Sequence, residues 1–154
     1  VKPDQVTLVP DPPEALTSSE GWDTKNNKNF LIEVIHQFKR RRIRTSIFVD
    51  TRLEMIEYAK DTGTDRVELY TEPYAAGYKK NREKAIKPFV VAAEKANEMK
   101  LGINAGHDLN LQNLEYFHRN IPGLLEVSIG HALISDALYF GLENTIQMYK
   151  NKLK

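Results

Sequence analysis

Five short apolar runs, each followed by a segment with helical spacing, constrain the fold of this 154-residue chain most strongly. The runs are rich in Val, Ile and Leu and show no long polar alternation, as expected of strands covered on both faces. We predict strands at residues 6–10, 46–50, 66–70, 101–104 and 125–129. Because strands and helical segments alternate throughout, the sequence predicts an α/β fold with a parallel sheet.

The segments between these runs carry apolar residues at three- and four-residue spacing. We predict helices around residues 30–38, 53–59, 79–99, 111–117 and 138–149. Pro88 lies inside the longest of them and predicts a kink or a division there. Ser135 and Asp136 are good N-cap residues, so we expect the last helix to begin close to them.

Composition limits the class of protein. Hydrophobic residues make up 41% of the chain and charged residues 28%. These proportions are typical of a globular chain, and we expect residues 1–154 to belong to a single domain.

The net charge of +1 gives no reason to expect nucleic acid or an acidic membrane surface as a partner. No long apolar run predicts a membrane span, no cysteine is present, and no His, Asp and Glu set has metal-ligand spacing. The chain begins with Val rather than Met, so we expect an N-terminal part to be missing.

Two apolar runs end in Gly-His, namely LGINAGHDL at 101–109 and LLEVSIGHALI at 124–134. Glycine lets backbone approach a ligand closely, and histidine titrates near neutral pH. Active sites of open α/β sheets and of (β/α)₈ barrels form where strands end. We therefore predict one shared pocket at these two ends, with the long polar loop at about 10–24 as a candidate lid.

The order and spacing of several motifs resemble the pyridoxine 5′-phosphate synthase family over essentially the whole chain. The motifs are VTLVPD (6–11), ALTSSEGWD (15–23), TSIFVD (45–50), DRVELYTEPYA (65–75), INAGHDLNLQNL (103–114) and VSIGHALISDAL (127–138). The resemblance implies a (β/α)₈ TIM barrel of which this chain supplies about the last five βα units. Strands one to three, with the family's general bases (a histidine and a glutamate) and several phosphate ligands, would then be missing.

The resemblance also implies an activity in vitamin B6 biosynthesis. Family members condense 3-amino-2-oxopropyl phosphate with 1-deoxy-D-xylulose 5-phosphate to give pyridoxine 5′-phosphate, phosphate and water. Two phosphorylated small molecules would be the substrates, with no metal or organic cofactor, in a cytoplasmic homo-oligomer that is commonly an octamer.

Two residues are candidates for catalysis. The resemblance assigns His107 as the proton donor, whereas the residues alone favour a loop histidine that caps the following helix. Glu68 lies in the middle of a predicted strand and would point into the barrel, where a carboxylate is costly unless it is paired or functional. The resemblance makes it a transition-state stabiliser in the motif Glu-x-x-Thr, which ends here at Thr71; the alternatives are an ion pair with Arg or Lys, or an outward side chain. Glu72 stands where many family members have glycine.

Four residues are candidates for substrate binding. The resemblance places Gly130 and His131 on the aminoketone phosphate, although a tight turn would also call for this glycine. Asp108 stands where the family often has a glycine that touches the same substrate; a backbone contact survives that change, whereas a carboxylate near phosphate is unfavourable. The resemblance assigns Thr17 to the deoxyxylulose phosphate, and a Thr in a Ser/Thr-rich loop is also an ordinary turn residue.

Two other functions stay open at this stage. One is a phosphosugar isomerase, aldolase or epimerase on the same barrel. A Schiff-base aldolase would need a lysine at a strand end, and none of the five predicted strands ends in one. The other is an inactive barrel fragment, because an open half-barrel exposes two sheet edges.

Overall fold

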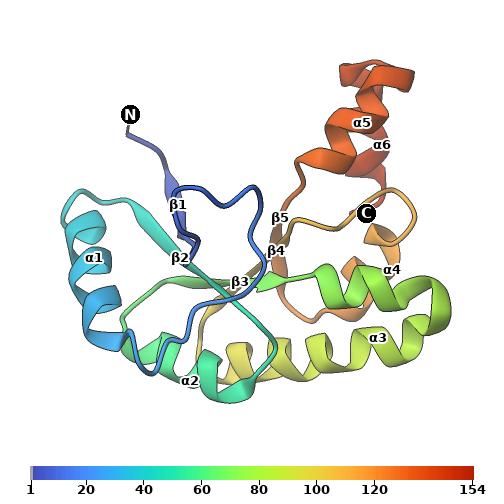
Figure 1. The fold of residues 1–154 in the computed structure, drawn as a ribbon. Helices are drawn as coiled ribbons and strands as arrows, with labels where there is room; N and C mark the ends of the chain where they lie inside the picture. The colour runs from blue at the N-terminus through green and yellow to red at the C-terminus, as the bar shows by residue number, and fades with distance from the viewer. Residues whose placement is uncertain (1) are drawn as a thin grey trace.

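The computed structural model describes residues 2–154, which form a parallel sheet with helices along its outer face (Figure 1). The elements in chain order are β1 (Gln5–Leu8), α1 (Lys28–Arg40), β2 (Arg44–Val49), α2 (Leu53–Asp61), β3 (Arg66–Tyr70), α3 (Glu72–Glu98), β4 (Gly102–Gly106), α4 (Leu114–Asn120), β5 (Leu124–Ser128), α5 (His131–Phe140) and α6 (Leu142–Asn151). All five predicted strands are confirmed, with ends displaced by at most two residues.

The strands lie in the sheet in their chain order, β1-β2-β3-β4-β5, and every neighbouring pair is parallel. Each connection between successive strands carries a helix. The predicted α/β class and parallel sheet are therefore confirmed, and all five strands end at the same edge of the sheet.

The sheet is strongly curled. In a flat sheet β2 and β5 would lie roughly 14 Å apart, three spacings of about 4.8 Å. Arg44 of β2 nevertheless reaches Glu126 of β5, with 3.3 Å between Nη2 and Oε2. The hydroxyl of Thr7 on β1 likewise reaches Glu68 on β3. These contacts cross the concave face, so the five strands form a curled half-barrel.

The two faces of the half-barrel differ in polarity because successive side chains of a strand point to opposite faces. The convex face packs against the helices through a buried apolar set that includes Ile47, Val67, Leu69 and Ile103. Burying such side chains contributes roughly 1.5–3 kcal/mol each. The concave face carries polar groups instead. They include Thr7 and Ser46, which pair with each other across β1 and β2, and Glu68 and Asn104, which pair in another row across β3 and β4.

The longest helix differs from its prediction in two ways. It begins at Glu72, seven residues before the predicted start, and its break falls at Asn81 (φ −162°, ψ 92°) rather than at Pro88. The side chain of Asn81 accepts a hydrogen bond from the Lys84 N–H at 2.8 Å and so caps the second half of the helix. Asparagine is a strong N-cap. This capping signal, and not the proline, decides where α3 breaks, and the prediction at Pro88 was wrong.

The single helix predicted over 138–149 is two helices. Gly141 separates α5 from α6 with φ 77°. This is a left-handed conformation that glycine adopts without strain. Helix α5 begins at His131, directly after Gly130, so the expected start near Ser135 was also wrong.

Helices α5 and α6 pack on each other and project away from the sheet (Figure 1). No residue of α5 is buried, and its large apolar side chains are exposed at Ile134, Leu138, Tyr139 and Phe140. Large exposed apolar patches on a protein mark sites of interaction with another protein, a membrane or a ligand.

Candidate functional site

A cavity of about 1060 Å³ opens at the carboxyl ends of the strands. It is lined by the loop after β1, by the end of β4 and by the segment that joins β5 to α5. Five of the six residues predicted for the site line it, namely Thr17, His107, Asp108, Gly130 and His131. Because β1 and β5 are the two edge strands, the curl of the sheet is what brings these residues together.

Glu68, the sixth predicted residue, lies on the concave face and is not among the residues that line this cavity. Its side chain is buried, and the Thr7 hydroxyl donates a hydrogen bond to Oε2 at 3.0 Å. Within residues 2–154 Glu68 forms no ion pair. The structure therefore excludes the outward orientation, and among the described residues it shows no Arg or Lys partner for this carboxylate.

Burial raises the pKa of the Glu68 carboxyl above its ordinary value, because desolvation disfavours the charged form. The hydrogen bond from Thr7, the nearby charge of His107 and the contact with Ser128 act in the opposite direction but do not cancel the effect of burial. Glu68 therefore holds a proton to higher pH than an exposed glutamate does, which is typical of functional carboxyls in clefts.

Gly106 creates the space for this carboxylate. A Cβ at that position would lie 2.8 Å from Oε1 of Glu68 and 2.7 Å from the carbonyl oxygen of Ser128. Both distances are too short for carbon against oxygen. The glycine of the first Gly-His pair is thus required because the backbone of β4 approaches Glu68 and β5 closely.

His107 follows Gly106 in a strained conformation. Its φ is 84°. Non-glycine residues rarely adopt this left-handed region, and strain of this kind concentrates at active sites. The imidazole stacks on Phe48, with 4.8 Å between ring centroids and an interplanar angle of 28°. Its Nδ1 is buried with no hydrogen-bond partner among the described residues. Helix α4 begins only at Leu114, so His107 does not cap it.

Gly130 and His131 stand at the end of β5. Gly130 has φ −104°, and none of the described atoms lies within 4 Å of the place a Cβ would take. The turn itself therefore does not demand glycine here. The bare Cα leaves room for close approach of a ligand, and His131 is the exposed first residue of α5, where backbone N–H groups lack helical partners.

Thr17 and Asp108 both line the cavity, Thr17 from the loop after β1 and Asp108 from the segment that follows β4. Thr17 is exposed on the long loop after β1, next to Ser18, whose hydroxyl donates to the Asp11 carboxylate. Asp108 is half-buried, and its backbone N–H donates to the Thr71 hydroxyl at 3.3 Å. The backbone of Asp108 is thus fixed within the fold while its residue borders the cavity.

Three contributors to the site were not predicted: Thr7, Phe48 and Ser128. Each lies on the concave face beside Glu68 or His107. Strand alternation is the signal that identifies them, because Phe48, Glu68 and Asn104 share one register row on that face. The contact between Thr7 and Glu68 depends on the curl of the sheet, which alternation does not encode.

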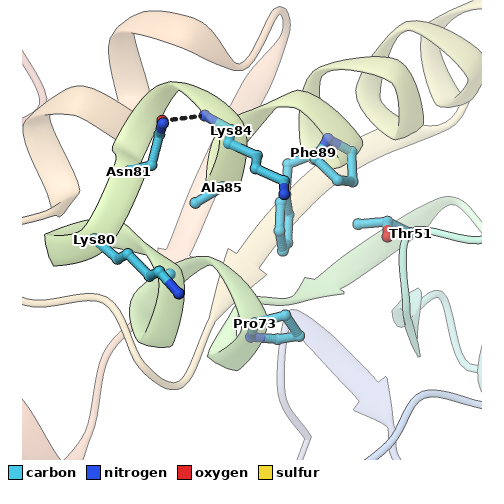
Figure 2. Close-up of a pocket in the computed structure, with 9 residues that line it drawn as sticks. Thr51, Pro73, Lys80, Asn81, Lys84, Ala85 and Phe89 are labelled. Carbon is cyan, nitrogen blue, oxygen red and sulfur yellow. Dashed lines mark hydrogen bonds between the residues drawn. The ribbon is translucent and has the colours of Figure 1, made fainter.

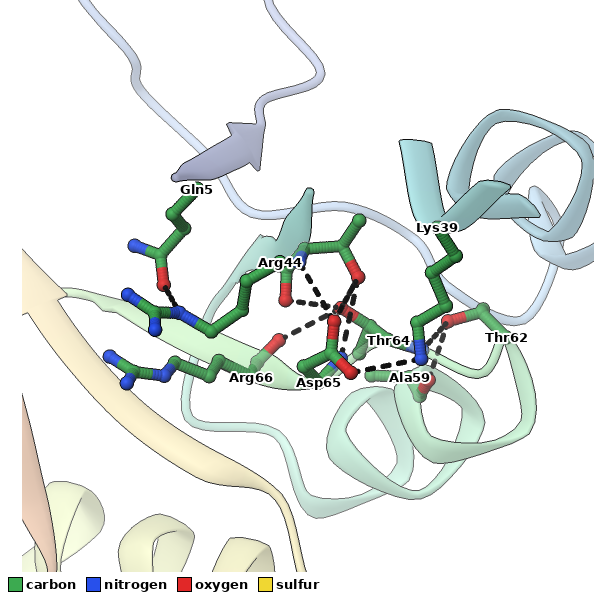
Figure 3. A network of polar contacts seen from close by, with 9 residues as sticks. Gln5, Lys39, Arg44, Ala59, Thr62, Thr64, Asp65 and Arg66 are labelled. Carbon is green, nitrogen blue, oxygen red and sulfur yellow. Dashed lines mark hydrogen bonds and ion pairs between the residues drawn. The ribbon is translucent and has the colours of Figure 1, made fainter. Parts of the chain in front are cut away.

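The opposite end of the strands is built for stability (Figure 3). Asp65 accepts hydrogen bonds from the N–H and hydroxyl of Thr45 at 2.8 and 3.0 Å and pairs with Lys39 at 2.9 Å. Arg44 donates to Gln5 at 2.7 Å. In barrels this end of the sheet supports the fold rather than the chemistry.

A second cavity, of about 550 Å³, lies on the flank of α3 beside the break at Asn81 (Figure 2). Pro73, Ala85 and Phe89 give it apolar walls, and Lys80 and Lys84 stand at its margin. Among the residues that line it there is no predicted site residue, no histidine and no carboxylate. The cavity at the strand ends is therefore the candidate site.

Two kinds of feature are absent from residues 2–154. No group of three His, Asp or Glu side chains is placed to hold a metal ion. No helix combines the length and the apolar character needed to cross a bilayer. The absence of a cofactor stays a prediction from the family resemblance.

Comparison with known proteins decides the family. Residues 1–154 match the family described as pyridoxal phosphate biosynthesis protein PdxJ. This chain belongs to that family. The resemblance drawn from the sequence motifs is thereby confirmed.

Several curated relatives carry the name pyridoxine 5′-phosphate synthase. The one from Flavobacterium johnsoniae is 65% identical over 153 residues, which cover 99% of this chain and 65% of the relative. The one from Bacteroides thetaiotaomicron is 64% identical over 154 residues, which cover 100% of this chain and 65% of the relative. The one from Porphyromonas gingivalis is 57% identical over 153 residues, which cover 99% of this chain and 64% of the relative. The chain thus spans about 65% of the length of these relatives.

Proposed function

We propose that this protein is a pyridoxine 5′-phosphate synthase. It condenses 3-amino-2-oxopropyl phosphate with 1-deoxy-D-xylulose 5-phosphate and releases pyridoxine 5′-phosphate, inorganic phosphate and water. One observation carries the proposal. Five predicted site residues from three separate segments line a single cavity at the strand ends, with the buried carboxyl of Glu68 beside His107. The name shared by the relatives supports the same reaction.

The phosphate of the aminoketone binds at Gly130 and His131 in this proposal. Backbone N–H groups at the start of a helix attract anions, and α5 begins at His131. The bare Cα of Gly130 lets the phosphate approach the backbone. Thr17 offers a hydroxyl to the second phosphorylated substrate across the same cavity, and Asp108 contributes its backbone on the side of His107.

The condensation needs repeated proton transfers and the loss of hydroxyl groups. His107 donates a proton to a departing hydroxyl as a general acid, a role worth about 10²–10⁴ in rate. Glu68 stabilises the positive charge of imine-like intermediates, because a buried carboxylate interacts strongly with a cation in a low-dielectric site. No metal or organic cofactor enters these steps.

The proposal includes the remainder of the fold. We assign the chain to a single (β/α)₈ barrel domain of which it supplies about the last five βα units. The edges of β1 and β5 are unpaired within the described sheet, and further strands would pair with them. The exposed apolar side chains of α5 favour the predicted homo-oligomer, with an octamer as the expected form. We also propose that the protein works in the cytoplasm.

An assay on the full-length protein tests the function. Both substrates are supplied together, and each is then omitted in turn; product is expected only when both are present. His107→Gln is expected to lower kcat by about 10²-fold or more. His36→Gln is the matched control, because His36 is exposed on α1 and does not line the cavity. Equal loss in both variants, or none in either, would refute the role of His107.

A further inference from the structure

Thr71 stands at the end of β3 and immediately before α3, and its side chain is fully buried. A threonine at a helix N-cap normally bonds a backbone N–H of the first helical turn. Thr71 makes no such bond, although it occupies the N-cap position of α3. Its hydroxyl is used elsewhere.

That hydroxyl reaches across to the end of β4 and contacts both peptide groups that flank His107. It donates a hydrogen bond to the carbonyl oxygen of Gly106, and it accepts one from the N–H of Asp108 at 3.3 Å. One side-chain oxygen therefore holds the chain just before and just after the predicted proton donor.

Two further bonds complete the restraint. The N–H of His107 donates to the carbonyl oxygen of Ser128 at 3.0 Å. The side-chain amide of Asn113 donates to the carbonyl oxygen of Asp108 at 3.2 Å. A non-glycine residue persists in the left-handed region only where its surroundings over-determine the conformation. Of the hydrogen-bonding groups named here, Thr71 alone acts on both sides of His107.

The backbone conformation of His107 sets where its imidazole lies. A change of φ toward negative values would swing Cβ away and separate the ring from Phe48, on which it now stacks. We propose that Thr71 is a positioning residue, whose hydroxyl holds His107 in its left-handed conformation and so orients the imidazole toward the substrate cavity. This inference rests on the proposed role of His107.

Removal and retention of the hydroxyl test the proposal in the full-length protein. Thr71→Val keeps the shape of the side chain, and we expect kcat to fall by about 10²-fold, the scale for misplacing a catalytic group by an ångström. KM is expected to stay within about twofold, since Thr71 does not line the cavity. Thr71→Ser restores the hydroxyl and is expected to recover kcat to within about threefold of the unsubstituted protein.

The matched control is Thr24→Val. Thr24 is also fully buried, and its hydroxyl donates to a backbone carbonyl, that of Met55, at 2.7 Å. It does not belong to the cavity lining, so its loss is expected to lower Tm while kcat is unchanged. Equal effects of Thr24→Val and Thr71→Val on kcat, or a Thr71→Ser variant as inactive as Thr71→Val, would overturn the proposal.

A second measurement applies even if Thr71→Val unfolds or if the protein makes no pyridoxine 5′-phosphate. Thermal unfolding is compared for Thr71→Val alone and in a His107→Gly background, where the left-handed conformation carries no strain. We expect the double variant to fold, and Thr71→Val to lower Tm more in that background, because loss of the hydroxyl releases backbone strain only when residue 107 is histidine. An equal or smaller fall in Tm would contradict the positioning role. Absence of product from the unsubstituted protein would instead refute the proposed function.

Discussion

The close approach at Gly106 makes one substitution especially informative. Gly106→Ala adds a single methyl group at the end of β4. That carbon would lie 2.7 Å from the Ser128 carbonyl oxygen, 2.8 Å from Oε1 of Glu68 and 3.0 Å from Cβ of Ser128. Gly106 does not have positive φ, so the cost comes from packing and not from the backbone angles of alanine.

The size of the effect follows from what has to move. The Ser128 carbonyl is backbone and accepts the N–H of His107, and the Glu68 carboxylate is buried and held by Thr7. The first group is backbone, and the second, although it is the end of a side chain, is held in place by the Thr7 hydroxyl. Overpacking of this kind costs about 1–3 kcal/mol. For a domain of this size such a loss lowers Tm by roughly 3–10 °C. Displacement of Glu68 and His107 is expected to lower kcat by about 10²-fold as well.

Thermal unfolding followed by circular dichroism measures the stability change, and the condensation assay measures kcat. Gly130→Ala is the matched control for stability, because its added Cβ meets no described atom within 4 Å and its φ is −104°. Its Tm is expected to match that of the unsubstituted protein. Gly106→Ala with an unchanged Tm, or with the same Tm shift as Gly130→Ala, would show that the contacts at the end of β4 are not as described.

Three further predictions concern charged groups. Since burial raises the pKa of Glu68, the native state binds its proton more tightly than the unfolded state, and ionisation destabilises the fold above the ordinary value of 4.5. At pH 7 Glu68→Gln is therefore expected to raise Tm relative to the unsubstituted protein, and at pH 4 this gain should be smaller. A gain in Tm that is the same at both pH values would contradict this. The substitution is also expected to lower kcat by about 10²-fold. For Asp65, burial raises the pKa, but hydrogen bonds from Thr45 and the ion pair outweigh it, so the native pKa lies below 3.8. Asp65→Asn is expected to cost about 1 kcal/mol in urea unfolding at pH 7, allowing for solvent screening, and the difference should vanish as the pH falls below that native pKa. Glu126→Ala leaves the half-buried guanidinium of Arg66 without its carboxylate partner. It is expected to lower the free energy of unfolding by about 1–3 kcal/mol. If the unpaired guanidinium causes this loss, adding Arg66→Met to Glu126→Ala should recover stability.

Much of the fold could be predicted because the strands are short and apolar and alternate with helical spacing. The breaks in the helices could not be predicted equally well. At α3 the sequence offers a proline and a capping asparagine, and the structure breaks at Asn81. At the last helix the apolar spacing continues across Gly141, so periodicity alone did not reveal that α5 and α6 are separate.

Six residues of the candidate site could be predicted from the sequence, whereas Thr7, Phe48, Ser128 and the geometry of the site could not. The two Gly-His strand ends placed His107 and His131 at one edge of the sheet, and in the structure the predicted Thr17 joins them from the loop after the far edge strand. Residues from the two edge strands can line one cavity only because the sheet curls. The curl is a property of the whole assembly of strands. The restraint on His107 by Thr71 is equally non-local, since it joins residues 36 positions apart in sequence (107 − 71).

The most direct test of this account is a crystal structure of the full-length protein with 3-amino-2-oxopropyl phosphate bound. The account predicts that the phosphate lies against the backbone of Gly130 and His131, inside the cavity that His107 lines and next to the Glu68 carboxyl. A phosphate bound away from that cavity, or a substrate whose reacting carbons lie beyond the reach of both His107 and Glu68, would contradict it.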